Sequence, residues 1–266
     1  MKRCVILVLA CLIAVGALCG CGARQPDTSL PKLLIGSDTY PPYIYMDNNG
    51  DITGLDVELA QEAFRRMGYE AEFTSIDWER KKALVDAGEI DCIWGCFSMN
   101  EREEDYRWAG PYMVSRQVVA VNRHSDIQAI EDLAGRSIAV QATTKPEELF
   151  LTRPTDDIPE VKAVFSLEDR SVQYAALESG YVDAIAAHEE AITQYMEDYG
   201  ADFRFLAPPL LTTGIGVAFS NNDTRGLAGE LTKTLAEMRQ DGTMLAIVSK
   251  YIAHPESYLE VETLGR

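Results

Sequence analysis

The sequence predicts an α/β protein built from two similar lobes. Short apolar runs alternate with helical patterns and are separated by glycines, the order expected of parallel strands covered by helices. One stretch of this pattern recurs 92 residues later, and only helical patterns follow the last strand-like run. The hydrophobic share of 47% against 25% charged residues is enough for a real core, which excludes a disordered chain.

The first half of the chain alternates between the two kinds of element. Its predicted elements, in order, are a strand at 33–36, a helix at 57–67, a strand at 71–73, a helix at 78–87 and a strand at 90–94. The first helix is predicted because apolar residues recur with the helical period up to Met67, and Gly68 follows at the usual cap position. This order favours a parallel sheet.

The repeated stretch lies at the end of a helix and the start of a strand. Residues 83–93 read ALVDAGEIDCI, and residues 175–185 read AALESGYVDAI. In both, a helix ends at a glycine, and an apolar residue followed by aspartate opens a buried strand. Glycine caps before strands are common, so coincidence stays open. Two similar lobes is the interpretation that explains the shared spacing.

Two further strand-like runs predict how the lobes are connected. These are 117–122 (QVVAVN) and 214–219 (GIGVAF), and helical patterns at 225–240 and 243–251 follow the second. Two crossovers that flank a central segment predict one discontinuous lobe with another inserted in it. We therefore expect lobe 1 at 32–120 plus 214–266 and lobe 2 at 121–213, with ligands bound at the carboxyl ends of the strands.

The N-terminus reads as an export signal. A basic start precedes an apolar run from Cys4 to Cys19, too short for a typical membrane span. Leu18-Cys19-Gly20-Cys21 resembles a bacterial lipobox, which predicts a signal peptide at 1–20, lipidation of Cys21 (palmitate among the acyl groups) and a flexible tether at 21–31. An uncleaved helix, or a secreted protein cut nearby, are the alternatives. The expected location is the extracytoplasmic face of the cell membrane.

Composition excludes several classes of partner. The chain has 42 acidic and 24 basic residues among 266, a formal net charge of −18. A surface this negative repels phosphate backbones, so no nucleic-acid partner is expected. The six cysteines form no Cys-x-x-Cys pair and predict neither a disulfide scaffold nor a zinc site. No metal and no cofactor are expected.

A series of motifs in order resembles one known family. The motifs are Asp38-Thr39-Tyr40-Pro41-Pro42-Tyr43, Gly54 to Ala60 (GLDVELA), Asp77-Trp78, Gly88 to Asp91 (GEID), Gly95 to Arg102 (GCFSMNER), Ala109 to Tyr112 (AGPY), Leu133 to Arg136 (LAGR), Val140-Gln141 and Asp241-Gly242-Thr243. Together they resemble the polar amino-acid-binding proteins of bacterial ABC transporters, extracellular solute-binding protein family 3. The resemblance implies a two-lobed periplasmic-binding-protein (type II) fold, with a small, mostly parallel sheet in each lobe and a ligand cleft between the lobes.

The resemblance also implies ligand-binding roles for named residues. Arg102 would hold a ligand carboxylate, which suits the bidentate geometry of a guanidinium. Tyr40 and Trp78 would enclose the ligand between aromatic rings. Asp38 lies where several members read the ligand side chain, although an aspartate that stabilises the following turn is an equal alternative. Gly95 and Phe97 belong to the same loop motif as Arg102.

The second lobe is expected to contribute a turn at a helix N-terminus. Gln141, Thr143 and Thr144 follow a predicted strand, and free backbone N–H groups at such a turn suit a carboxylate. In the family this turn reads Q-x-G-T-T, so Thr143 replaces a glycine and Lys145 replaces the second threonine.

Two further positions depart from the family pattern. Phe97 replaces the usual threonine, and His188 replaces the aspartate that pairs the ligand α-ammonium. A buried cation needs an anionic partner, which Glu189, Asp38 or Glu190 would have to supply. Otherwise the ligand is not an ordinary α-amino acid.

Cys92 and Cys96 flank the end of a predicted strand. Four residues of extended chain span about 13 Å, which is beyond the reach of a disulfide. We therefore expect two buried thiols, with a disulfide across a turn at Gly95 as the alternative.

The function expected from these observations is solute capture. The chain is predicted to be a monomeric lipoprotein, not an enzyme, that delivers a small polar ligand, expected to be an amino acid, to the permease subunits of an ABC importer. No catalytic motif is present. The alternatives are an enzyme of the same fold, such as a cyclohexadienyl-type dehydratase using His188 and Glu189, or a sensory ligand-binding protein.

Overall fold

The computed structural model describes residues 30–264, and the chain from Pro31 onward forms one compact unit. The predicted signal peptide at 1–20, the lipidated Cys21 and almost all of the predicted tether at 21–31 lie outside the described residues. Within the described part, no helix combines the length and the apolar character needed to cross a bilayer.

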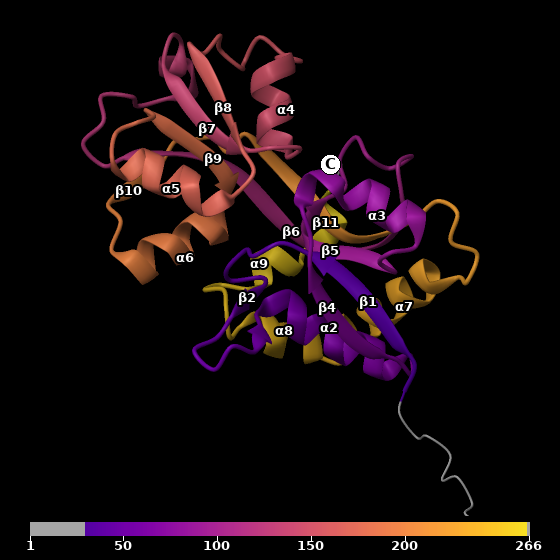
Figure 1. The fold of residues 1–266 in the computed structure, drawn as a ribbon. Coiled ribbons are helices and arrows are strands. Elements are labelled where there is room, and N and C mark those ends of the chain that lie inside the picture. Colours follow the sequence, from indigo (N-terminus) through magenta and orange to yellow (C-terminus); the bar gives the residue numbers. More distant parts are fainter. Residues whose placement is uncertain (1–29, 265–266) are drawn as a thin grey trace, which may run out of the picture. The chain divides into compact units, whose positions relative to one another are not determined.

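The first half of the chain forms a parallel sheet covered by helices. Its elements are β1 (Lys32–Ser37), the small hairpin β2 (Tyr45–Met46) and β3 (Ile52–Thr53), α2 (Leu55–Arg66), β4 (Glu70–Ser75), a 3-10 turn at Trp78–Arg80, α3 (Lys81–Ala87) and β5 (Cys92–Ser98). Strand β1 lies between β4 and β5 and runs parallel to both (Figure 1). The predicted order of elements is confirmed. The helix predicted at 78–87 is in fact a 3-10 turn followed by α3.

The central part of the chain repeats this arrangement. Its elements are a 3-10 turn at Ile130–Leu133, β7 (Ser137–Gln141), α4 (Lys145–Thr152), β8 (Ala163–Leu167), α5 (Arg170–Glu178), β9 (Ala184–His188), α6 (Glu189–Tyr199) and β10 (Phe203–Phe205). Strand β7 lies between β8 and β9 and runs parallel to both. It therefore takes the place in this sheet that β1 takes in the first.

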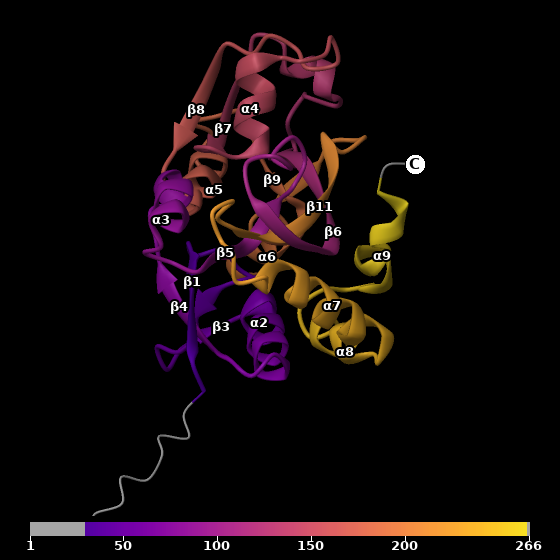
Figure 2. The ribbon, with the colours of Figure 1, turned by 90° about the vertical axis from the view of Figure 1, so that its right-hand side faces the viewer.

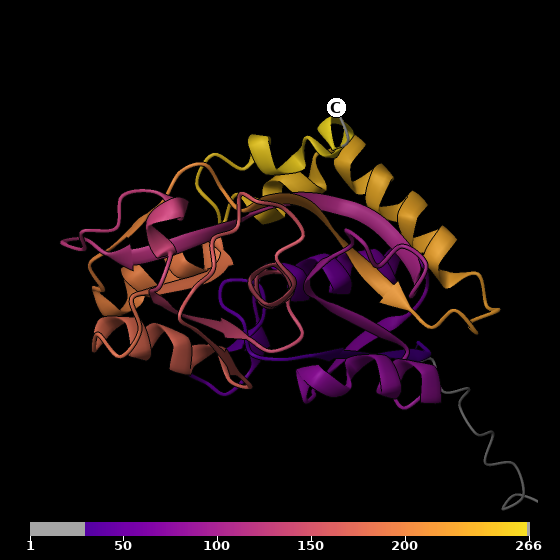
Figure 3. The ribbon, with the colours of Figure 1, turned by 90° about the horizontal axis from the view of Figure 1, so that it is seen from above.

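Two long antiparallel strands join the two sheets. Strand β6 (Arg107–Asn122) pairs first with β11 (Leu211–Phe219) and then, through its last residues, with β9 and β10. The resulting sheet has the order β4-β1-β5-β11-β6-β9-β7-β8, and Figure 3 shows β6 extending from one lobe to the other. Both strands are longer than the runs predicted at 117–122 and 214–219. The first part of β6 mixes buried and half-buried positions, so the apolar run at 117–122 revealed only the end of this strand.

The chain ends in helices that return to the first lobe. These are α7 (Leu227–Gln240), α8 (Thr243–Val248), α9 (Glu256–Leu259) and a 3-10 turn at Val261–Thr263. Helices α7 and α8 pack against α2 (Figure 2). Phe64, Trp94 and Leu231 are fully buried in this lobe, whereas Ile138, Leu177 and Ile185 are fully buried in cores of the second lobe. The protein has the predicted two-lobed α/β fold. The boundaries predicted for the lobes stay a prediction.

The repeated sequence stretch is a repeated local structure. Gly88 and Gly180 both have a φ of 72°, the left-handed conformation that a glycine adopts without strain. Asp91 then accepts a hydrogen bond of 2.8 Å from the backbone N–H of Leu34, and Asp183 accepts one of 2.8 Å from that of Ser137. In each lobe the aspartate fixes the strand after the glycine to the first strand of the sheet.

Candidate ligand-binding site

A cavity lies where the carboxyl ends of β5, β7 and β9 meet. It encloses about 380 Å³ of empty space including its opening to solvent, of which only about 20 Å³ admits the centre of a water-sized molecule, so the walls lie close together. Its lining residues are Tyr40, Trp78, Cys96, Phe97, Ser98, Arg102, Gln117, Gln141, Thr143, Thr144, Lys145, Pro146, Arg170, Gln173, Ala186, Ala187 and His188. Both lobes contribute to it, as expected for strand ends in α/β sheets.

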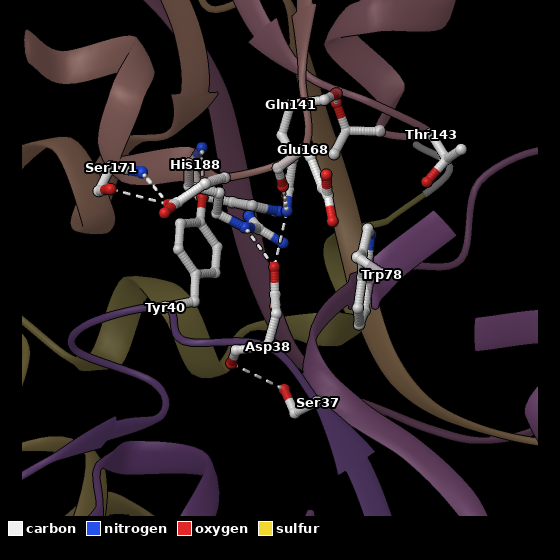
Figure 4. Close-up of polar contacts among 12 residues, drawn as sticks. Ser37, Asp38, Tyr40, Trp78, Gln141, Thr143, Glu168, Ser171 and His188 are labelled. Carbon is white, nitrogen blue, oxygen red and sulfur yellow. Dashed lines mark hydrogen bonds and ion pairs between the residues drawn. The ribbon is translucent and has the colours of Figure 1, made fainter. Parts of the chain in front are cut away.

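Aromatic rings form the wall contributed by the first lobe. Tyr40, Trp78 and Phe97 are all buried, and Figure 4 shows Tyr40 and Trp78 on opposite sides of Asp38. The ring centroids of Trp78 and Phe97 lie 5.3 Å apart, and Phe97 also packs edge-on against Tyr106 at 5.4 Å. Phe97 is therefore fixed within an aromatic cluster and provides an apolar surface where a threonine would offer a hydroxyl.

Arg102 lies in this cavity without an acidic partner. Its guanidinium donates to the carbonyl oxygens of Ser98 at 3.3 Å and Thr143 at 3.2 Å. Within residues 30–264 it is ion-paired to no carboxylate, and burial lowers its pKa. Two backbone carbonyls only partly compensate this half-buried guanidinium, so Arg102 is ready to bind a carboxylate.

A second arginine, Arg170 at the start of α5, occupies the space between the two aromatic rings. Its guanidinium carbon lies 3.4 Å from the ring centroid of Tyr40 and 5.7 Å from that of Trp78. Its Nε donates to the Asp38 carboxylate at 3.1 Å, and Gln141 donates to the same oxygen at 2.7 Å. Burial disfavours the charge of Arg170, but Asp38 and Tyr40 outweigh burial and raise its pKa.

Asp38, for which a ligand contact or a structural role was expected, makes its contacts within the protein. Its carboxylate binds groups of the protein itself and does not line the cavity. Figure 4 shows it directed toward Gln141. The space beside Asp38, where the resemblance places the ligand side chain, therefore contains the guanidinium of Arg170.

Two lysines add to the positive charge of the site. Lys145 is 1% exposed and is paired with Glu101 at 2.7 Å and Glu148 at 2.8 Å. Lys81 donates to the carbonyl of Trp78 at 3.0 Å and to the Thr143 hydroxyl at 2.7 Å. Burial, together with the nearby charges of Arg102 and Arg170, lowers the pKa of Lys81 to about 7.

His188 is a neutral member of a buried hydrogen-bond chain. Burial first, and Arg170 second, lower its pKa to about 3. Gln117 Nε2 lies 2.8 Å from His188 Nε2, and Ser115 Oγ lies 2.7 Å from Nδ1. With the Gln117 amide donating to Nε2, the ring proton is assigned to Nδ1. His188 thus lines the cavity, but it supplies no negative charge for an ammonium group.

The acids expected to replace the missing aspartate do not reach the cavity. Glu189 is paired with Arg116, and Glu190 accepts hydrogen bonds of 2.9 Å from both Tyr43 and Ser115. Neither lines the cavity. Helix α6 begins at Glu189 and turns its side chain toward Arg116 of β6, and its contact with a ligand stays a prediction.

Two backbone expectations also need correction. Gly95 lies in β5 and does not line the cavity, and a Cβ there would lie 2.2 Å from the Ser37 hydroxyl. The backbone N–H of Thr143 is not free, since it donates to Glu147 at 2.6 Å. The turn before α4 therefore has its own carboxylate.

The predicted buried thiols are confirmed. Cys92 and Cys96 are both buried and unpaired, and burial raises the pKa of each thiol well above its usual value.

Sequence reasoning missed several lining residues of the cavity. These are Ser98, Gln117, Lys145, Arg170 and Gln173, together with Lys81 just behind the wall. Arg170 follows Glu168-Asp169 and reads as an ordinary charged helix start. Gln117 and Gln173 gave no signal, whereas Lys145 was noted only as a replacement for a threonine.

Comparisons with known proteins agree with this architecture. The probable amino-acid-binding protein YxeM of Bacillus subtilis (strain 168) is 24% identical over 94% of this chain and 95% of its own length. An ancestral arginine-binding protein, solved with arginine, is 25% identical with a TM-score of 0.76 over 84% of this chain and 98% of that one. A substrate-binding protein of a Streptococcus pneumoniae ABC uptake transporter, solved with histidine, is 25% identical with a TM-score of 0.77 over 83% and 92%.

The match to a family model covers most of the described residues. It extends over residues 33–254, from the first strand of the first lobe to the segment after α8. The chain belongs to the bacterial extracellular solute-binding proteins, family 3.

Proposed function

We propose that this protein captures a small carboxylate-bearing solute, in the first place an amino acid, and delivers it to the permease subunits of an ABC importer. The observation that carries this proposal is Arg102, a half-buried guanidinium in a cavity between the lobes with no acidic partner among residues 30–264. The relatives named above bind amino acids by their descriptions, which supports the same class of ligand here.

Capture would proceed by closure of one lobe on the other. The crossovers at Val118–Asn122 and Gly214–Ala218 lie within β6 and β11, where bending would move the two walls. Contacts across the cavity support this motion, because they join the walls directly. Arg102 donates to Thr143, and Lys145 pairs with Glu101. Closure around the ligand would exclude water and strengthen its polar contacts.

We also propose that Cys21 carries a lipid that holds the protein, as a monomer, at the outer face of the cell membrane. The lipobox-like sequence before Cys21 supports this anchor. Cell fractionation tests it, because Cys21→Ala should move the protein from the membrane fraction to the soluble one. Retention of the variant in the membrane would overturn lipidation at this residue.

Titration calorimetry of the full chain in detergent tests solute capture. Resident ligand is first removed by unfolding and refolding, and amino acids and small carboxylates are then titrated. We expect Arg102→Ala to weaken binding by about 30-fold or more, as expected when one partner of a buried charge pair is truncated. Arg65→Ala, in the exposed Arg65–Glu62 pair of α2, is the matched control and should bind normally. Equal affinities of Arg102→Ala and the native protein would refute the proposed role.

An enzymatic role for His188 and Glu189 has little support in this geometry. A histidine with a pKa of about 3 does not exchange protons near neutrality, and Glu189 faces Arg116 outside the cavity. Solute binding without catalysis is therefore the function that these two residues favour.

A further inference from the structure

Arg170 changes what the cavity can accept. The rings of Tyr40 and Trp78 and the carboxylate of Asp38 form a subsite suited to a cationic or flat ligand group. The guanidinium of Arg170 fills that subsite, so a ligand side chain cannot enter it without displacing a buried ion pair. Because the pair is 6% and 15% exposed at its two side chains, its displacement would be costly.

The charges around the cavity do not balance. Three lining residues are basic, namely Arg102, Lys145 and Arg170, and among the described residues no aspartate or glutamate lines the cavity. Asp38 compensates Arg170, and Glu101 with Glu148 compensates Lys145. In the part of the chain that the structure describes, Arg102 has no such partner. Lys81 behind the wall has none there either, since it bonds to a carbonyl and a hydroxyl.

Arg170 also has donors left over. Only its Nε is used, so within residues 30–264 its two terminal nitrogens have no hydrogen-bond partner. Three buried glutamines, Gln117, Gln141 and Gln173, line the same cavity, each with an amide oxygen that lacks a partner. The site therefore offers two guanidinium groups for anions and neutral oxygens for a donor such as an amino group.

From these observations we propose that the ligand is a small dicarboxylate, with one carboxylate bound by Arg102 and the other by the terminal nitrogens of Arg170. The inference rests on the proposed function and specifies its ligand class. Two carboxylates balance the two uncompensated cations, Arg102 and Lys81. A neutral amino acid has no net charge, so it would leave the net positive charge of these two groups in place, and it has no second carboxylate for Arg170. An arginine ligand would add a third guanidinium to the cavity.

Matched ligand pairs test the inference without any change to the protein. Glutamate and glutamine have nearly the same shape, and so do aspartate and asparagine, but only the acids carry a second carboxylate. We expect the full chain in detergent, freed of resident ligand, to bind one of the two acids about 30-fold more tightly than its amide. Glutarate distinguishes an acidic amino acid from a dicarboxylate without an amino group, because it has both carboxylates of glutamate and no amino group.

Arg170→Gln tests the residue assignment. This variant should lose the preference for acid over amide, while Arg123→Gln, in the exposed Arg123–Asp202 pair, should retain it. If Arg170→Gln does not fold, the ligand pairs in the native protein still decide the ligand class.

The possible outcomes separate the inference from the proposed function. Tighter binding of a neutral or basic amino acid than of both acids would overturn the dicarboxylate and leave solute capture intact. Binding of glutarate without glutamate or aspartate would support the dicarboxylate and remove the amino acid from the proposed function. No binding by any ligand of the panel would overturn both.

Discussion

The two lobes share a scaffold but differ in the walls that they present to the cavity. Each contains a central parallel strand, β1 or β7, to which an aspartate after a left-handed glycine is hydrogen-bonded. The first lobe contributes aromatic rings and Arg102, whereas the second contributes Arg170, two glutamines, two threonines and the neutral His188. The repeated part of each lobe holds the sheet together, and the strand ends carry the differences.

This difference shows where ligand choice resides. Residues that fix strands to one another are constrained by backbone hydrogen bonds in both lobes. Side chains at the strand ends contact the cavity and other side chains but take no part in the backbone pairing, so they can change without loss of the sheet. His188 at the end of β9 and Arg170 at the start of α5 occupy such positions.

Among the tests of how the two walls differ, the largest change in ligand affinity is expected from a new negative charge on the wall formed by the second lobe. His188→Asp places a carboxylate at the end of β9, and His188→Asn is its neutral counterpart of the same size. We expect His188→Asp to bind the dicarboxylate at least about tenfold more weakly than His188→Asn, because like charges buried at close range repel strongly. Its affinity for glutamine should not fall, since the α-ammonium gains an anionic partner.

The same calorimetric titrations measure both ligands in both variants. Asparagine and aspartate can each accept the hydrogen bond that the Gln117 amide donates and have nearly the same shape, so the pair isolates charge from packing. Equal affinity of the two variants for the dicarboxylate would mean that the charge of the second wall does not select the ligand.

The sequence predicted the first wall better than the second, for a physical reason. Tyr40, Trp78 and Arg102 belong to short local motifs whose backbone fixes where the side chain points. Arg170 is brought to Tyr40 from 130 residues away by the packing of one lobe on the other. No local pattern encodes such a contact, and a charged helix start is usually exposed to solvent.

The fold was predictable because its signals are local and periodic. Alternating strand and helix patterns located β1, α2, β4, α3 and β5 but not the small hairpin of β2 and β3, and the repeated glycine and aspartate revealed the duplication. Asp38 and Glu189 were assigned to a ligand because a carboxylate suits a cationic ligand group, and those ligand contacts stay predictions. Their partners, Arg170 and Arg116, come from distant elements and could not be identified from spacing.

The smallest effect is expected at Lys81, which lies behind the first wall and touches the second through Thr143. With burial and the charges of Arg102 and Arg170 lowering its pKa to about 7, Lys81 loses its proton near neutrality in the free protein. A bound dicarboxylate should raise that pKa, so binding should take up a proton and affinity should fall as pH rises above about 7. Asp38 and Glu79 also act on Lys81 and raise its pKa, whereas His188, with a pKa of about 3, stays neutral throughout this range.

Calorimetry in two buffers of different ionisation enthalpy measures that proton uptake directly. The Lys81→Met variant should take up no proton and should show a nearly flat pH profile, with affinity reduced by less than about tenfold at a pH below the Lys81 pKa. A pH profile that persists in Lys81→Met would assign the proton to another group. Affinity that is independent of pH in the native protein would mean that the ligand's charge is balanced by Arg102 and Arg170 alone. The second lobe would then act on the ligand directly through Arg170, and not through Lys81, which connects the two walls by its hydrogen bond to Thr143.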